Sequence, residues 1–113
     1  MALKFKPRPE SAEIPFLEGS VLKVKRPTAL ERHQITAKLK KEGIEDAAQI
    51  WDAITESYLT GWDGIEDGDS DKTLSFNPEN RRKIYRLLDD DLSADGMKAR
   101  EAFYVFVNGI AGN

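Results

Sequence analysis

The front of the chain changes from a charged, proline-containing stretch to an alternating apolar pattern. Residues 1–13 contain two prolines and five charged side chains, and we expect them to form an extended N-terminal arm rather than part of a core. From Leu22 onward apolar and polar residues alternate, which is typical of a half-buried strand, and a Glu-Gly-Ser turn precedes it. Residues 14–26 therefore predict a short β-hairpin.

Behind the hairpin, four stretches carry the start, stop and periodicity signals of α-helices. They are residues 28–41, 45–60, 77–88 and 93–108. Thr28 and Glu31 have the spacing of a capping box. Asn77 precedes a proline at the first helical position, and Gly109 is suited to stop the last helix. The fold class is therefore predicted as mainly α: a small helical domain of about four helices with a short N-terminal β-hairpin, in which residues 14–113 form a single domain after the arm.

The spacing of apolar residues assigns each of these helices a side that faces the core. In the second helix, the residues expected there are Ala47, Ile50, Trp51, Ile54 and Tyr58. Gly61 is expected to end this helix, with Trp62 packing back onto it. In the third helix, the expected core residues are Ile84, Leu87 and Leu88. The last helix is apolar on more than one side, so it is either central in the fold or meets a partner.

The residue types that carry most protein chemistry are rare in this chain. It has no cysteine and one histidine, His33, which excludes disulfides, thiolate metal sites and sites built from several histidines. Neither a catalytic nor a phosphate-binding motif occurs, nor a run of about 20 apolar residues that would span a membrane. The acids of residues 67–71 resemble the opening of a calcium loop, but Lys72 and Pro78 replace its essential glycine and glutamate. We therefore predict no enzyme, no cofactor and no metal site.

Charge is divided unevenly along the chain. Residues 1–44 hold ten Lys and Arg against five Asp and Glu, whereas residues 45–113 hold seven against fifteen. Opposite signs of this kind suit head-to-tail contacts between subunits. The basic residues lack interleaved aromatic residues, so we do not expect nucleic-acid binding. The side chains that we nominate for contacts with a partner are Tyr104, Val107, Lys23, Lys25, Arg26 and Lys38.

The order of several short motifs resembles one protein family. The run Tyr58-Leu-Thr-Gly-Trp-Asp-Gly64 is followed by an acidic loop and then by Leu74-Ser-Phe-Asn-Pro-Glu-Asn80. A basic-Arg-Pro-Thr run, Lys25 to Thr28, stands before the first predicted helix, and a Leu-Leu-Asp helix end comes before the last one. Over residues 20–113 this order resembles the tail assembly chaperones of long-tailed bacteriophages and prophages. Those proteins have a Gly-Trp-Asp-Gly-Val segment, a variable acidic loop and a Phe-Thr-Pro-Glu-Asn helix start.

The resemblance implies a mainly helical protein that associates with itself and binds the long tape-measure protein. Binding keeps the tape-measure protein soluble until tail-tube protein polymerises around it. The expected location is the host bacterial cytoplasm, not the mature virion. In many such phages a ribosomal frameshift adds a C-terminal extension that recruits tail-tube protein. This chain ends at Asn113 without one, so the resemblance implies the shorter form.

Two other functions stay open. Another small virion protein or a head–tail joining protein would share the same predicted architecture, and a gene position immediately before a tape-measure gene would separate these possibilities. A small nucleic-acid-binding regulator is the other alternative, and failure to shift DNA at low salt would dismiss it.

Overall fold

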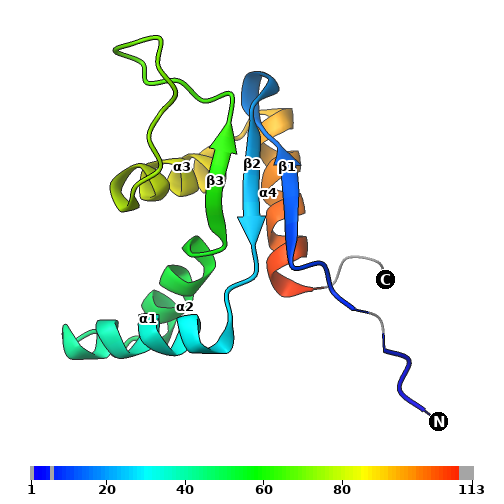
Figure 1. Cartoon of the computed structure of the whole chain (residues 1–113), viewed down its shortest axis with the longest axis vertical. Coiled ribbons are helices and arrows are strands. Elements are labelled where there is room, and N and C mark those ends of the chain that lie inside the picture. Colours follow the sequence, from blue (N-terminus) through cyan, green and yellow to red (C-terminus); the bar gives the residue numbers. More distant parts are fainter. Residues whose placement is uncertain (1, 6, 110–113) are drawn as a thin grey trace.

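Three antiparallel strands and four α-helices make up the described part of the chain, residues 2–5 and 7–109 of this computed structural model (Figure 1). The strands are β1 (Ser11–Pro15), β2 (Val21–Lys25) and β3 (Leu59–Asp63), in the spatial order β1-β2-β3. The helices are α1 (Ala29–Lys41), α2 (Ala47–Glu56), α3 (Pro78–Asp90) and α4 (Ala94–Asn108). The last four residues, where we placed the end of the shorter family form, lie outside the described residues.

The third strand overturns the predicted fold class. A mainly α domain with only a hairpin is wrong, because β3 completes a sheet and makes the fold α+β. The predicted helix 45–60 ends at Glu56. The pairing of β2 with β3 contains a bulge: Lys23 faces Gly61 and Val24 faces Leu59, which leaves the residue between them without a partner. Residues 59 and 62 are therefore both buried although they lie three apart, a spacing that is typical of a helix.

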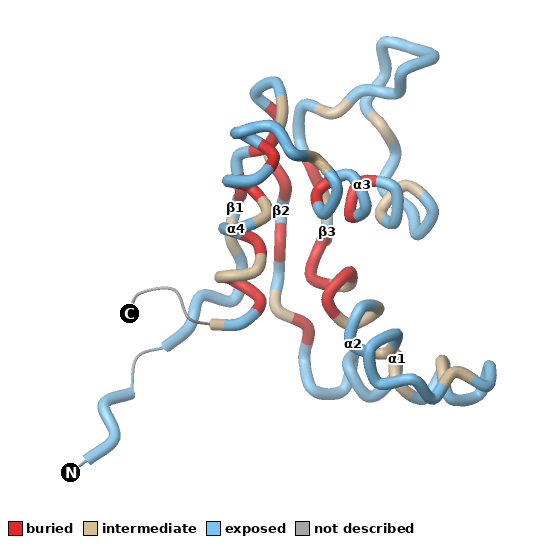
Figure 2. The backbone as a smooth tube through the Cα atoms, turned by 180° about the vertical axis from the view of Figure 1, so that it is seen from behind, coloured by how far each residue is buried: buried red, intermediate tan, exposed pale blue. Residues whose placement is uncertain are grey.

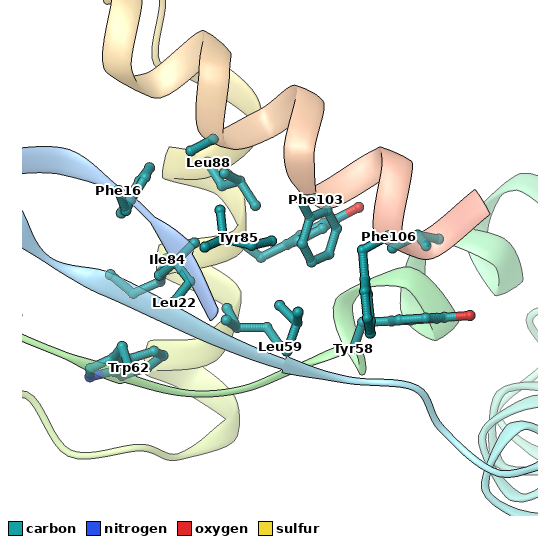
Figure 3. Packing of buried hydrophobic residues seen from close by; sticks show 14 residues of the cluster. Phe16, Leu22, Tyr58, Leu59, Trp62, Ile84, Tyr85, Leu88, Phe103 and Phe106 are labelled. Carbon is teal, nitrogen blue, oxygen red and sulfur yellow. The ribbon is translucent and has the colours of Figure 1, made fainter. Parts of the chain in front are cut away.

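One face of the sheet carries the core (Figures 1 and 2). Alternation along β2 points Leu22 and Val24 toward α3 and α4, and leaves Lys23 and Lys25 on the opposite, open face. Phe103 lies at the centre of the cluster in Figure 3, where it is fully buried between aromatic neighbours. The other large, fully buried apolar side chains are Leu22, Val24, Leu59 and Leu88. The sheet, α3 and α4 thus form the hydrophobic core.

The helix starts agree with the sequence signals. Both hydrogen bonds of the capping box between Thr28 and Glu31 are present, and they lower the pKa of the Glu31 carboxyl. Asn77 accepts a hydrogen bond from the Asn80 amide at 2.8 Å. The side chain of Ser93 caps α4. The helix starts predicted at Thr28 and Asn77 and the stop predicted at Gly109 are confirmed. None of the helices in the described residues has the length and apolar character that crossing a membrane requires.

The α1–α2 pair, which we call the helical hairpin, projects beyond the end of the sheet (Figure 1). None of the side chains of α1 is buried. Of the predicted core face of α2, only Ile54 packs against the core, followed by Tyr58, while Trp51 is 53% exposed. The radius of gyration is 15.6 Å, against about 13 Å for a compact chain of this length. The structure thus corrects the expectation that Trp51 is buried, because α2 points away from the sheet.

Candidate partner-binding groove

An open groove runs between α1 and α3, with α2 as its floor. It consists of two adjoining clefts of about 450 and 550 Å³. Four residues line both clefts: Leu39, Ala53, Glu56 and Arg82. We call this feature the hairpin groove. It exists because the helical hairpin leans away from α3 and does not pack tightly on it.

The apolar part of the hairpin groove comes from the weak stripe of α1. Ile35 and Leu39 lie one turn apart and are half-buried, since only α2 is available to cover them. Ile44, just beyond α1, extends this apolar wall into the other cleft. Half-buried aliphatic side chains along an open groove are the type of surface that accepts the apolar side of another helix.

An ion pair crosses the floor of the hairpin groove. The Glu56 side chain is 8% exposed, and its Oε1 lies 3.3 Å from Nε of Arg82. Its Oε2 lies 3.9 Å from a guanidinium nitrogen of Arg81. Burying a carboxylate is costly unless it is paired, so the two arginines hold the end of α2 against α3. Among the described residues, no partner accepts a hydrogen bond from the buried Nε of Arg81. This junction positions the helical hairpin relative to the core.

Tyr85 lines the hairpin groove, and Tyr104 lies beside the groove near α4. Tyr85 donates a hydrogen bond to Asp52 at 3.0 Å and joins α3 to α2. Tyr104 donates one to Asp89 at 3.1 Å and joins α4 to α3. Burial raises the pKa of both tyrosine hydroxyls, so they stay protonated at neutral pH. They therefore act as hydrogen-bond donors that link the helices.

A second apolar surface lies beside the groove on α2. Ile50 and Trp51 lie on the apolar side of this helix, one turn before Ile54. Only the end of that side, Ile54, packs against the core, whereas Trp51 is exposed and Ile50 is half-buried. We call Ile50 and Trp51 the α2 patch. A half-exposed tryptophan on an apolar helical face is typical of a residue that anchors a partner.

The six side chains nominated from the sequence do not come together. Lys38 lines the hairpin groove, and Tyr104 lies next to it through its bond to Asp89. Lys23 and Lys25 lie on the open face of the sheet, where Lys23 pairs with Asp63 at 3.2 Å. That pairing interrupts the positive charge that nucleic-acid backbones would need.

The other two nominated residues serve the fold. Val107 is 5% exposed and belongs to the core, which corrects its assignment to a contact surface. Arg26 donates a hydrogen bond to the carbonyl oxygen of Phe106 at 3.0 Å, near the end of α4. Its guanidinium carbon lies 4.8 Å from the Phe106 ring centroid and 6.0 Å from that of Tyr58. This residue therefore braces β2 against α4.

The motif that carries the family resemblance also shapes the fold. Trp62 is buried, and its Nε1 donates a hydrogen bond to the Leu74 carbonyl at 2.9 Å, which closes the acidic loop. Gly64 turns the chain with a φ of 75°, a conformation that glycine adopts without strain. In the loop itself, the Asp69 amide donates to the Asp67 side chain at 3.0 Å. No three metal-ligating side chains converge in the part of the chain that the structure describes.

The geometry can also be set beside known proteins. Comparisons with protein-family models, curated proteins and solved structures found no match. The candidate site therefore rests on the residues themselves.

Sequence reasoning missed the polar junction of the hairpin groove. Glu56 and Arg82 lie 26 positions apart, and each has the pattern of a solvent-exposed helical residue. A signal for the α2 patch was present, because the apolar stripe of this helix contains the large aromatic residue Trp51. What the sequence did not reveal is that Trp51 lies largely in solvent, while Ile50 beside it is half-buried.

Proposed function

We propose that the chain is a tail assembly chaperone that associates with itself and holds the tape-measure protein in soluble form. The observation that carries this proposal is the uncovered apolar surface of the helical hairpin, the α2 patch together with the aliphatic wall of the hairpin groove. The motif order around Trp62 and Asn80 supports the choice of partner, because it resembles that family.

A tape-measure protein of the kind that the family implies is long and helical, with one apolar stripe. Such a stripe binds an amphipathic helical surface through a few large anchors in a groove. Trp51 would supply the anchor, and Leu39 would supply the neighbouring wall. Many copies of the chain along one partner would each cover a short segment, so a modest affinity at each site is sufficient.

The arrangement of the helical hairpin suits a role in binding. Its exposed apolar side chains contribute little to the core, so they are free to contact a partner at little cost in stability. Contact with a partner helix would bury them and remove apolar area from water, which is the main favourable term in such association. The buried Glu56 pair would keep the hairpin in place while this happens.

Co-expression with the tape-measure protein of the same genome tests the proposal. The wild-type chain should keep that protein in the soluble fraction and co-purify with it. Trp51→Asp should weaken binding about 30-fold or more, since it removes an aromatic anchor and adds a charge. Met97→Asp is the matched control, because Met97 is 47% exposed, against 53% for Trp51, and lies on α4 away from the hairpin.

Three outcomes would overturn the proposal. They are a tape-measure protein that stays insoluble beside the wild-type chain, equal binding by the Trp51→Asp and wild-type chains, and recovery of the chain from mature virions. The third result would favour a virion or head–tail joining protein instead. Circular dichroism of both variants confirms that any loss of binding is not a loss of fold.

A further inference from the structure

The N-terminal arm exposes apolar side chains in an extended segment. Leu3 is 90% exposed and Phe5 is 80% exposed. They alternate in sequence with Lys4 and Lys6, so an extended arm has one apolar side and one basic side. Large apolar groups left in water on a segment without secondary structure gain free energy when another surface covers them.

A groove with the complementary properties lies at the opposite end of the molecule. Its volume is about 760 Å³, and it is lined by residues of the β1–β2 turn, the end of β3, α3 and the start of α4. Phe16, Ile65 and Leu87 provide its apolar floor, and Glu18, Glu66 and Asp95 provide its acidic rim. The groove has no basic residue among its described lining. We call it the acidic groove.

The arm is too short to reach the acidic groove of its own chain. Arg8 packs against the end of α4, where a methyl group on Gly109 would lie 2.6 Å from the guanidinium carbon. Phe5 is three residues from Arg8 and reaches only about 10 Å beyond it. Strand β1 alone spans about 17 Å before the groove begins at Phe16. In Figure 1 the arm leaves the lower end of β1, whereas the β1–β2 turn lies at the top.

We propose that the arm of one copy binds in the acidic groove of the next copy. Phe5 would pack on the apolar floor, and the two lysines of the arm would face the carboxylates of the rim. The basic side of the arm is complementary to the acidic rim of the groove, and the apolar side of the arm is complementary to the apolar floor. Complementary charges steer and orient such contacts. Arm and groove lie at opposite ends of one chain, so the contact is head-to-tail and produces a ring or an open row of subunits.

Glu18 gives this groove an unusual feature. It is the one residue other than glycine with a positive φ among those described, at 52°. Glycine or asparagine would adopt this conformation at lower cost. A glutamate that is kept in a strained position at the rim is consistent with a role for its carboxylate. Glu18→Gly relieves this strain, so its effect on association can be separated from an effect on folding.

Sedimentation velocity of the full chain, over a concentration series at low and high salt, tests the inference. The wild-type chain should associate more strongly at low salt. Phe5→Asp alters the arm and Leu87→Asp alters the groove floor, and each should weaken self-association at least about tenfold. Glu18→Gly should weaken it about threefold at low salt, while its thermal midpoint stays unchanged or rises.

The decisive experiment mixes the two variants. The Phe5→Asp chain keeps an intact groove, and the Leu87→Asp chain keeps an intact arm. A head-to-tail contact predicts that the mixture forms a 1:1 heterodimer and nothing larger, because each heterodimer offers only one altered arm and one altered groove. Should Leu87→Asp fail to fold, Glu66→Lys on the exposed rim and Lys4→Glu on the arm provide a second test by charge exchange. Each variant alone should associate weakly, and the mixture should associate again, because both of its arm–groove contacts pair opposite charges.

This inference rests on the self-association that the proposed function includes. It is overturned if the wild-type chain stays monomeric at all concentrations, if Phe5→Asp associates like the wild type, or if the mixed variants form no heterodimer. These measurements need no tape-measure protein. A monomeric chain that still solubilises the tape-measure protein would therefore overturn this inference and the self-association but leave the binding of the tape-measure protein standing, whereas an associating chain that fails to solubilise it would overturn only the chaperone role.

Discussion

Replacing Arg26 separates a role in the fold from a role in partner binding. Its guanidinium donates to the Phe106 carbonyl at 3.0 Å and stacks on the Phe106 ring, while the preceding Lys25 lies exposed on the other face of β2. We consider Arg26→Ala, which removes both contacts, and Arg26→Lys, which keeps the charge near the end of α4. Lys25→Ala is the matched control, because it deletes a neighbouring positive charge that lies outside the core.

The expected change in the free energy of unfolding combines two stabilising contributions of Arg26 and one destabilising contribution. A hydrogen bond from a charged donor contributes about 1.5–3 kcal/mol, and the contact with the ring contributes about 0.5–2 kcal/mol. Against these, the Arg26 Nε is buried and has no hydrogen-bond partner among the described residues, and such a group costs about 1–3 kcal/mol. We therefore expect Arg26→Ala to lower the free energy of unfolding by about 2 kcal/mol. Arg26→Lys should lower it by about 1 kcal/mol, because a favourable charge at the helix C-terminus remains.

Urea unfolding followed by circular dichroism measures these differences. In a separate thermal unfolding experiment, the midpoint temperature of Arg26→Ala should lie about 8 °C below that of the wild type, at about 4 °C for each kcal/mol. Lys25→Ala should stay within about 0.5 kcal/mol of the wild type. An Arg26→Ala chain as stable as the Lys25→Ala chain would refute the reasoning and return Arg26 to the contact surface. Equal losses for alanine and lysine would show that the two guanidinium contacts, the hydrogen bond and the stacking, provide the stabilisation and that the charge near the helix end does not.

Three further predictions concern other parts of the fold. Burial raises the pKa of the Tyr85 hydroxyl, so stability is full below the ordinary tyrosine pKa of about 10 and falls as the pH rises above it. Urea midpoints measured from neutral to alkaline pH should show this fall, and Tyr85→Phe should reduce it. Gly96→Ala should destabilise the chain by about 1–3 kcal/mol despite the better helix propensity of alanine, because the added Cβ would collide with the side chain of Asp91; an unchanged urea midpoint would contradict this. Acrylamide should quench Trp51 far more than Trp62, as single-tryptophan variants would show, and equal quenching would contradict the exposure of the α2 patch.

The helix starts were predictable because they depend on local chemistry. A cap needs a polar side chain and an amide two or three residues later, and Thr28, Asn77 and Ser93 meet that condition with their near neighbours. The strand β3 was not predictable in the same way. Its bulge places Leu59 and Trp62 on one face, and the resulting apolar spacing of three residues imitates a helix that the preceding sequence already favours.

The exposure of apolar residues was harder to predict than their periodicity. The stripe on α2 and the Leu87 position on α3 both have the spacing of a core face, yet Trp51 and Leu87 lie substantially in solvent. Periodicity states which residues share a side of a helix, but only the packing of the other elements decides how much of that side is covered. The same limit applies to Val107 in reverse, because a helix that is apolar on two sides turned out to be central.

The position of the helical hairpin in the chain explains how binding and stability can be separated in this fold. Antiparallel neighbours such as β2 and β3 can be joined by a two-residue turn, yet here the connection is residues 26–58, which include α1, α2 and the exposed side chains of Leu30 and Trp51. Most of the core beneath the strands comes from the sheet, α3 and α4, and the connection contributes to it through its two ends, Arg26 and Tyr58. A connection that is long, exposed and held by a rigid scaffold is where binding residues are most often found. Substitutions on the α2 patch should therefore change partner binding far more than the free energy of unfolding, whereas substitutions at Arg26 or Phe103 should do the opposite.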